Sequence, residues 1–334
     1  MNNEKVIYDI VGIGNAMVDV IAKVSDKFLE ERNLIKGSMT LMDAETAGTI
    51  YQDIIPEREV SGGSVANTIA AMASLGCDCA FIGKVYDDEL GKTFKRDIGS
   101  IGIDFNTPPL LKGPSTARCI ILVTPDAERS MFTYLGAAKK LSADDIDENI
   151  IKTSKYVFLE GYLFDTDASI KALIKAAKIA HKYGRKIVLT LSDHRLIAAH
   201  REIFVEFIQK YVDILFANEL EIKELPSTTD LNTALEYVKS KVDIAIVTCH
   251  EKGAVILSKT EHTIVDAKYV ENVIDSSGAG DAYAAGFMYG LIKNKPLLQC
   301  AQIGTVVASE VITHYGARPE TSLRGLIRKH IETL

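Results

Sequence analysis

Hydrophobic positions along this chain fall into short apolar runs separated by amphipathic segments of helical length. Runs that suit buried strands begin at Val6 and recur at 80–85, 156–164, 186–191, 214–217 and 244–248. Segments with apolar residues at helical spacing lie at 64–76, 87–98, 168–183, 198–211 and 299–314. Such alternation predicts an α/β fold with a mainly parallel central sheet flanked by helices.

A second pattern predicts a small β-sheet beside this body. Residues 21–44 suggest a strand, a short helical piece and a strand at 38–42, and residues 116–136 suggest a hairpin around T-P-D-A-E-R. We therefore expect a discontinuous lid from about 17–44 and 110–136, within a single domain of residues 1–334. A lid of this kind excludes water from a reaction.

Composition and charge exclude several classes of protein. The 334 residues are 47% hydrophobic and 25% charged, which is enough for a large core, and the net charge of −7 without a basic block argues against nucleic acid as a partner. The apolar run 6–20 is broken by polar residues, so we expect neither a signal peptide nor a membrane span. Five irregularly spaced cysteines, Cys77 and Cys79 among them, predict free thiols in a reducing compartment, the cytoplasm.

The candidate chemistry centres on the stretch from Val273 to Gly290. Val273 and Ile274 end a strand-like run, a turn of small residues follows, and Asp281 opens an apolar helical segment. A glycine-rich turn at a helix N-terminus favours an anion, because free N–H groups and the helix dipole meet there. Asp281 is expected to stay ionised at this position and to act as a general base. An ordinary helix cap in a glycine-containing turn would look similar.

The sequence D-S-S-G-A-G-D-A-Y-A-A-G-F at 275–287 resembles the C-terminal signature of the ribokinase-like (PfkB) carbohydrate and nucleoside kinases. The resemblance implies a three-layer, Rossmann-like α/β domain with a β-sheet lid. It also implies that Gly278, Ala279 and Gly280 form an anion hole and that Asp281 is the catalytic base.

The resemblance assigns acceptor-binding residues to the N-terminal half. The G-N-x-x-x-D spacing of Asn15 and Asp19 is similar to the adenosine kinase branch, where the Asp binds a sugar diol through charge-assisted hydrogen bonds. G-G-S-x-x-N, at Gly62, Gly63, Ser64 and Asn67, resembles the N-terminal signature, in which backbone amides and the Asn contact the sugar. Val65 and Ile69 depart from that signature.

Two further side chains are candidates near the acceptor. Arg129, in an E-R-S segment, resembles a lid arginine of adenosine kinases that reaches toward phosphate, although an ordinary exposed arginine fits as well. Tyr162 or Phe164 can either pack in the core or stack on a nucleobase.

The nucleotide side is implied by three motifs. Asn218 and Glu221 form an N-x-x-E resembling the family's motif for Mg²⁺, which the Glu binds through water. Thr248 and Gly253 match the turn that holds ATP, but His250 replaces its first glycine and puts the backbone path in question. Thr305 and Ala308 lie on the helix expected beside adenine, and a monovalent cation such as K⁺ is plausible near Asp275.

These features predict an ATP- and Mg²⁺-dependent kinase for the primary 5′-hydroxyl of a nucleoside, converting adenosine to AMP. Inosine, ribose, fructose or a related sugar are alternative acceptors, and a non-catalytic nucleotide- or sugar-binding module is the alternative from a different class. A P-loop kinase and a dehydrogenase are disfavoured because their glycine fingerprints are missing from the sequence. The expected assembly is a monomer or a homodimer formed through the lid.

Overall fold

The apolar runs form a nine-stranded sheet in the computed structural model, which describes residues 5–126 and 128–331. Neighbouring strands are parallel from β12 to β6, while β13 and β14 add an antiparallel edge. The order across the sheet is β14 (His262–Val265), β13 (Ala254–Ser258), β12 (Ile244–Thr248), β11 (Ile214–Asn218), β10 (Lys186–Thr190), β9 (Ser154–Glu160), β1 (Tyr8–Ile13), β5 (Cys79–Ile82) and β6 (Ile103–Asp104).

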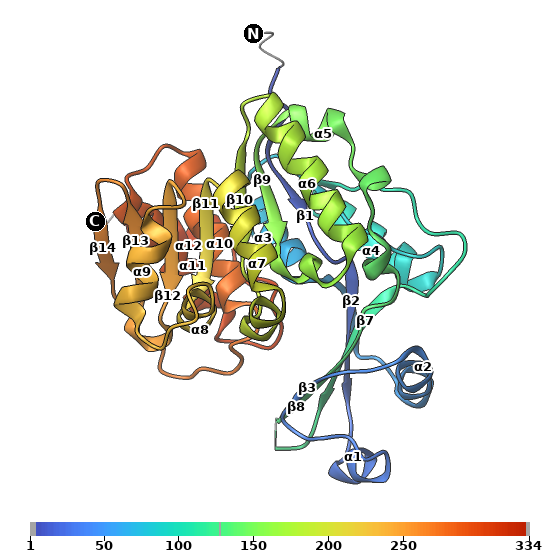
Figure 1. Ribbon diagram of the computed structural model, residues 1–334. Coiled ribbons are helices and arrows are strands. Elements are labelled where there is room, and N and C mark those ends of the chain that lie inside the picture. The colour runs from blue at the N-terminus through green and yellow to red at the C-terminus, as the bar shows by residue number, and fades with distance from the viewer. Residues whose placement is uncertain (1–4, 127, 332–334) are drawn as a thin grey trace.

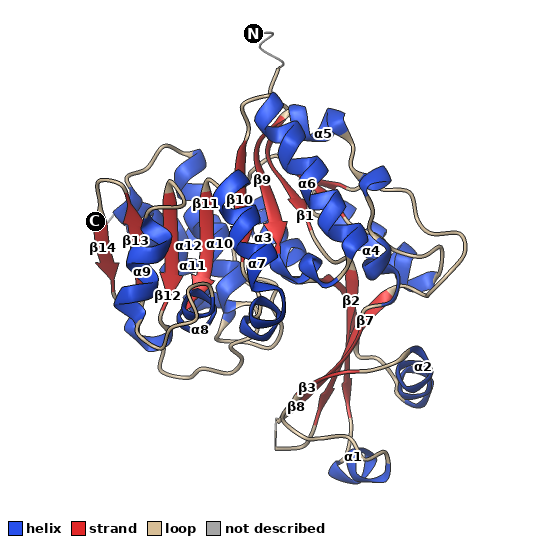
Figure 2. Ribbon diagram, viewed as in Figure 1, coloured by secondary structure: helices blue, strands red, loops and turns tan. Residues whose placement is uncertain are grey.

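Helices cover both faces of this sheet, giving three layers (Figures 1 and 2). Successive side chains of β9, such as Val157 and Phe158, enter two different apolar clusters because they point to opposite faces. One face packs against α3 (Ser64–Ser74), α4 (Glu89–Ser100), α10 (Ala279–Ile292), α11 (Leu297–Val311) and α12 (Leu323–Ile331). The other packs against α5 (Glu148–Lys152), α6 (Asp167–Lys182), α7 (His194–Tyr211), α8 (Glu219–Glu224) and α9 (Leu231–Lys239). Short 3₁₀ turns are η1 (Gly136–Lys140), η2 (Ala143–Asp145), η3 (Gly161–Asp165) and η4 (His250–Lys252).

A second sheet projects from the body and forms the lid (Figure 1). Its order in the described residues is β3 (Met39–Leu41), β8 (Arg129–Tyr134), β7 (Ala117–Val123), β2 (Met17–Lys23) and β4 (Arg58–Gly62). The outer face of the lid packs against α1 (Asp26–Glu31) and α2 (Ala44–Asp53), because Val18 and Val20 of β2 share a cluster with Leu29 and Ile50. The hairpin of 116–136 is present, with Ala127 of its turn outside the described residues.

Three local expectations need correction. β4 belongs to the lid although it lies outside both predicted lid segments. Val273 and Ile274 form no strand; they are 59% and 47% exposed in a loop, where the Ile274 N–H donates to the Ile312 carbonyl. The strand expected at 156–164 ends at Glu160, and Tyr162 and Phe164 belong to the turn η3.

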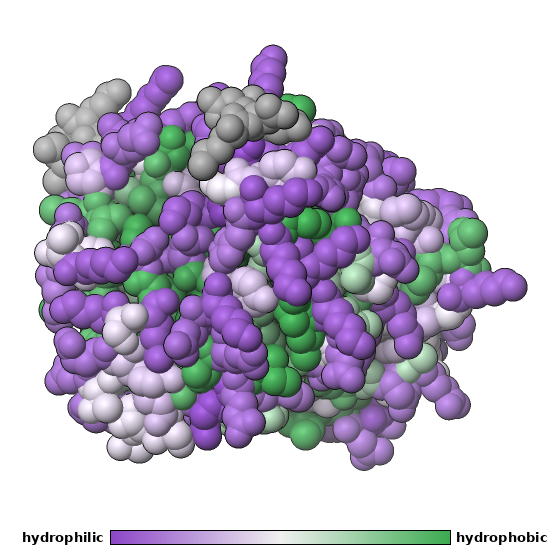
Figure 3. Space-filling view, turned by 45° about the horizontal axis from the view of Figure 1, so that its top comes forward, coloured by the Kyte–Doolittle hydropathy of each residue, from purple (hydrophilic) through white to green (hydrophobic). Residues whose placement is uncertain are grey.

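The surface is mixed in character. Hydrophilic side chains cover much of the face drawn in Figure 3, with apolar strips between them. Within residues 5–126 and 128–331, no helix has the length and apolar character needed to cross a bilayer. All five cysteines are free and buried, as expected.

Candidate active site

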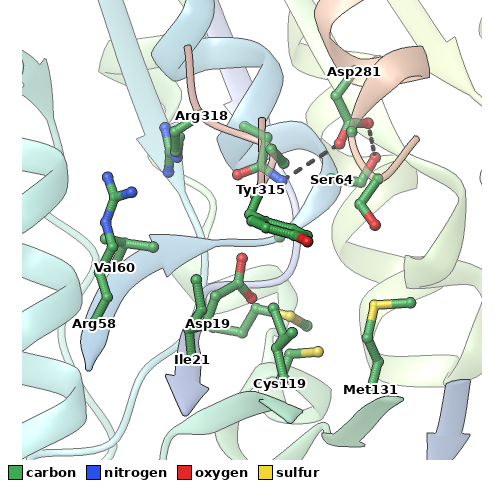
Figure 4. Close-up of a pocket in the computed structure, with 18 of the residues that line it drawn as sticks. Asp19, Ile21, Arg58, Val60, Ser64, Cys119, Met131, Asp281, Tyr315 and Arg318 are labelled. Carbon is green, nitrogen blue, oxygen red and sulfur yellow. Dashed lines mark hydrogen bonds between the residues drawn. The ribbon is translucent and has the colours of Figure 1, made fainter. Parts of the chain in front are cut away.

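A cavity of about 180 Å³ lies between the inner face of the lid and the N-termini of α3 and α10 (Figure 4). The lid contributes side chains from four strands: Met17, Asp19 and Ile21 of β2, Arg58 and Val60 of β4, Cys119 and Ile121 of β7, and Arg129 and Met131 of β8. The body contributes Gly63, Ser64, Asn67, Ser277, Gly278, Asp281 and the segment Tyr315–Arg318. The cavity therefore joins the two predicted signature motifs, which are far apart in the sequence.

Asp281 is the third residue of α10 and faces the start of α3. Its Oδ1 accepts a hydrogen bond from Ser64 Oγ at 2.6 Å, and its Oδ2 lies 3.5 Å from Asn67 Nδ2. Figure 4 shows Asp281 and Ser64 turned toward each other. Two helix N-termini thus hold one carboxylate at the wall of the cavity, where it can reach a hydroxyl group of a bound acceptor.

Burial opposes the ionisation of Asp281 that the helix start was expected to favour. Burial raises the pKa of this carboxyl to about 7, because removal from water disfavours the charged form. The hydrogen bonds from Ser64 and Asn67 and the charge of Arg318 act in the opposite direction. A carboxyl group that exchanges its proton near neutral pH is well matched to general-base work.

The turn before α10 has the form expected of an anion site. Gly278 is the N-cap, with φ of 75°, and a Cβ there would lie 2.4 Å from the Cβ of Ala317. Only glycine fits this left-handed, closely packed position. Gly278, Ala279 and Gly280 therefore bring the dipole end of a long helix to the cavity, where negative charge is stabilised.

Arg129 and Asp275 form an ion pair between the lid and this turn. The Arg129 side chain is only 10% exposed, so the interpretation as an ordinary exposed arginine is wrong. Asp275 also accepts N–H bonds from Ser277 at 2.9 Å and Gly316 at 3.0 Å. The monovalent cation suggested near Asp275 stays a prediction, at a carboxylate that already contacts the guanidinium group of Arg129.

Asp19 enters the cavity from β2 through a space that Gly62 leaves free. A Cβ at Gly62 would lie 2.5 Å from Cγ and both carboxylate oxygens of Asp19. Burial raises the pKa of Asp19 to about 6, and the charges of Arg318 and Arg129 oppose this shift. The Asp19 carboxylate therefore faces the cavity, where a residue predicted to bind acceptor hydroxyl groups must lie.

Asn67 supplies a second polar group. Its side chain is 7% exposed, and its Oδ1 atom has no hydrogen-bond partner among the described residues. A buried carbonyl oxygen without a partner is costly, and a ligand hydroxyl would satisfy it. Gly63 lines the cavity beside it as the N-cap of α3.

Asn15 lies beneath the cavity rather than in its wall. Its Nδ2 donates to Glu160 Oε1 at 2.7 Å, and its main-chain N–H donates to Oε2 at 3.2 Å. Glu160 also accepts the N–H of Val65 at 3.1 Å, so this 1% exposed carboxyl ties β1, β9 and α3 together. Burial raises the pKa of Glu160 to about 7. Its role was missed because a lone Glu at a strand end has no distinguishing sequence pattern.

The predicted nucleotide residues Asn218 and Thr248 are the last residues of β11 and β12, and neither they nor Glu221 line the cavity. Asn218 and Glu221 form a reciprocal capping box, with Asn218 Nδ2 donating to Glu221 Oε1 at 2.7 Å. Burial raises the pKa of Glu221 to about 7, and the nearby charges of Asp193 and Asp281 add to this rise. Thr248 is registered with Asn218 on the neighbouring strand.

No group of three or more His, Cys, Asp or Glu among the described residues is arranged to hold a metal directly. Even so, carboxylates that raise one another's pKa are suited to a hard divalent cation, which would compensate their charge. Glu221 and Asn218 therefore fit Mg²⁺ bound through water.

His250 stands where the first glycine of the predicted ATP turn was expected. It adopts φ of 51°, a left-handed conformation, and Gly253 adopts φ of 89° three residues later. His250 therefore takes up a conformation that favours glycine, at some cost in backbone strain.

Three remaining candidates lie apart from the cavity wall. Thr305 and Ala308 are half-buried on α11. Tyr162 is 38% exposed, near Glu160, Asp193 and Asp281, whose charges together with burial raise its pKa. The structure instead brings Tyr315 and Arg318 into the cavity, from an H-Y-G-A-R-P segment for which the sequence suggested no role.

The fold and this site are those expected of a phosphotransferase with an alcohol acceptor: a carboxylate faces a half-open cavity beside a helix N-terminus suited to an anion. The chain belongs to the pfkB family of carbohydrate kinases, whose model matches residues 57–323. Membership confirms the ribokinase-like fold and the kinase activity expected from the sequence. It implies ATP as phosphoryl donor, with Mg²⁺, and a small-molecule acceptor.

Known relatives include kinases of nucleosides and of sugars. The adenosine kinase of Sinorhizobium meliloti is 43% identical, with a TM-score of 0.88, and the match covers 97% of this chain and 99% of that one. A probable sugar kinase of Rhizobium etli CFN 42 is 39% identical, with a TM-score of 0.89 and coverage of 98% and 100%. An ATP-dependent ribose-1-phosphate kinase of Halopiger xanaduensis is 31% identical over 235 residues, or 70% of this chain and 73% of that protein.

Proposed function

We propose that this kinase transfers the γ-phosphoryl group of ATP to the primary 5′-hydroxyl of a nucleoside, with adenosine as acceptor and AMP as product. The main support is an apolar strip on the inner face of the lid. Ile21, Ile121 and Met131 line the cavity, and Met39 is registered with Met131 on the neighbouring strand. Met39 and Leu41 continue the strip beyond the cavity and are 41% and 62% exposed.

A bare sugar and a nucleoside would use this strip differently. Ribose or fructose presents hydroxyl groups on every side and would leave the apolar strip in water. A nucleoside held by Asp19 through its ribose diol would extend its base along the strip and remove that surface from water, which is favourable. The likeness to the Sinorhizobium meliloti adenosine kinase supports the same acceptor.

The proposed mechanism assigns each step to residues of this chain. Asp19 and Asn67 bind the ribose hydroxyls, and Asp281 removes the proton from the 5′-hydroxyl as its oxygen attacks the γ-phosphorus in line. The N-terminus of α10 at Gly278–Gly280 stabilises the charge that develops on the transferred group. Glu221 and Asn218 would hold Mg²⁺ through water, and the ion would neutralise phosphate charge. Closure by the lid keeps water from attacking ATP.

The structure of the lid is also informative about the oligomeric state of the protein. The outer face of the lid packs against α1 and α2, and much of its inner face lies over the cavity, with Met39 and Leu41 beyond it. We therefore infer a monomer rather than a dimer formed through the lid faces. Sedimentation equilibrium would test this inference, and a stable dimer that dissociates on mutation of lid residues would contradict it.

The assay that tests the function is ATP-dependent phosphorylation of adenosine, with inosine, ribose and fructose as parallel acceptors. Asp281→Asn serves as the catalytically inactive control. The proposal expects kcat/KM for adenosine to exceed that for either sugar by at least about 100-fold. Preferential turnover of a sugar would refute the nucleoside assignment and favour the sugar kinase alternative, to which the likeness to the Rhizobium etli protein points.

A further inference from the structure

Arg318 is a charged residue of the cavity for which the mechanism above has no role. It follows α11 in the segment that begins at Tyr315, and its half-buried side chain lines the cavity. Figure 4 shows Arg318, Asp19 and Asp281 around this one space. One cation and the two carboxylates to which the proposed mechanism gives roles therefore line the same cavity.

The guanidinium group of Arg318 is held by neutral partners. Its Nη2 donates to the Ser61 carbonyl at 2.7 Å and to Ser61 Oγ at 2.8 Å. Its Nε donates to the same carbonyl at 3.1 Å, and its Nη1 donates to the Ala66 carbonyl at 3.2 Å. Because these partners are carbonyl and hydroxyl oxygens, they fix the position of the charge without cancelling it.

One carboxylate lies behind this arrangement. Asp97 of α4 accepts both the N–H of Ser61 at 2.7 Å and its hydroxyl at 2.5 Å. Ser61 thus stands between Asp97 on one side and Arg318 on the other. The negative charge of Asp97 partly offsets the positive charge of Arg318. Asp97 acts from outside the cavity, because it is not among the residues that line it.

The other charged groups near the cavity are arranged differently. Arg129 contacts Asp275 directly, which reduces its effect on its surroundings. Arg58 lies at the rim, where half of its side chain is exposed and Glu320 is 3.8 Å away. Glu160 lies beneath the cavity and repels the charge on Asp281. Arg318 is the cation that opposes protonation of both Asp19 and Asp281.

We propose that Arg318 is a positioning residue whose fixed charge favours the ionised forms of Asp19 and Asp281. Asp281 must be a carboxylate to take the proton of the attacking hydroxyl, and Asp19 must be one to accept hydrogen bonds from a diol. Each of the two negative charges in this cavity disfavours the other, and a nearby cation offsets this effect. The inference rests on the proposed roles of Asp19 and Asp281, but not on the identity of the acceptor.

The test is the pH dependence of kcat and of acceptor kcat/KM between pH 5.5 and 9.5. It compares wild type, Arg318→Gln and Arg318→Lys, using whichever acceptor the wild type phosphorylates best. Gln retains hydrogen-bonding capacity without charge, whereas Lys retains charge. We expect the acid limb of Arg318→Gln to move up by about one pH unit, as loss of a nearby opposite charge predicts. Activity at pH 7 should fall about five-fold and recover most of the way at pH 9, while Arg318→Lys shifts less.

Asp97→Asn provides the reciprocal test outside the cavity. The asparagine side chain would still accept a hydrogen bond from Ser61, but the field of Arg318 would act more strongly on the cavity. The acid limb should then move down by roughly a few tenths of a pH unit. Thermal melting and MgATP dissociation constants confirm that each variant is folded and binds its donor.

The outcomes separate this inference from the proposed function. If Arg318→Gln loses activity equally at every pH, or if both substitutions leave the acid limb unchanged, Arg318 has only a structural role and the inference is wrong. If adenosine is not phosphorylated but a sugar is, the nucleoside assignment fails while the same pH comparison, made with that sugar, still decides the role of Arg318.

Discussion

Gly62→Ala is a small change that should act on a single interaction. Gly62 lies in β4 without a left-handed φ, so alanine is compatible with its backbone. The added methyl group would nevertheless stand 2.5 Å from Cγ and both oxygens of Asp19. Real contacts of this kind are longer, so the carboxylate must move out of the position from which it faces the cavity.

The size of the effect follows from the bonds that Asp19 would make. A hydrogen bond to a charged group contributes about 1.5–3 kcal/mol. Misplacing the two bonds to a ribose diol should therefore cost about 3 kcal/mol, which corresponds to roughly a 100-fold increase in acceptor KM. The KM for ATP should change less than about two-fold, because the predicted ATP turns lie on other strands.

Steady-state kinetics with adenosine and with 2′-deoxyadenosine would measure this effect. The deoxynucleoside lacks one of the two hydroxyls, so the penalty caused by Gly62→Ala should be smaller for it. Gly48→Ala is the matched control, since a Cβ at Gly48 in α2 meets nothing within 4 Å. An unchanged KM for adenosine, or an equal penalty for both nucleosides, would refute the role given to Asp19.

Further predictions concern the carboxylates and one strained residue. Asp281→Asn should lower kcat by several decades while the Kd for MgATP stays within about three-fold; a near-normal kcat would exclude Asp281 as the base. Burial raises the pKa of Asp19 to about 6 and of Asp281, Glu160 and Glu221 to about 7, above their ordinary values of 3.8 and 4.5. The folded state therefore binds protons more tightly than the unfolded state, and stability present below about pH 4 is lost as pH rises through 6–7. Melting of the ligand-free protein should accordingly show Tm falling from pH 5 to pH 8, less steeply in Asp281→Asn, and a Tm that rises over this range would contradict the shifts. His250→Gly should relieve the left-handed strain and stabilise the fold by up to about 1 kcal/mol in denaturant titrations; a destabilised variant would show that His250 makes compensating contacts.

Patterns of neighbouring residues in the sequence were sufficient to predict much of the fold and part of the candidate site. The alternation of apolar runs and amphipathic helices gave the body, and the Gly278–Asp281 turn was visible because its glycines and the following helix are adjacent in sequence. Asn218 and Glu221 also interact within a single helical turn, so spacing alone indicated their contact.

Other features depend on contacts between distant segments, which local patterns do not encode. Arg129 meets Asp275 across 146 positions, and Arg318 meets Ser61 across 257. Strand β4 was missed because R-E-V-S-G is short and mixed in polarity, and its pairing with β2 decides its conformation. Val273 and Ile274 led to the opposite error, since two neighbouring apolar residues suggest a strand even though no strand among the described residues pairs with them.

The interleaving of lid and body along the chain bears on how the protein folds during synthesis. β1 of the body leads within a few residues into β2 of the lid, yet β1 pairs with β5 and β9, and β2 pairs with β4 and β7. These two strands therefore gain their first partners roughly 40 to 70 residues later and their second partners roughly 100 to 150 residues later, which favours slow folding. α10, which packs against α3, arrives later still. During synthesis, strands of the N-terminal half should therefore have unpaired edges until their partner strands are made. We expect the yield of folded kinase to depend on chaperones more strongly than the stability of the folded protein would suggest.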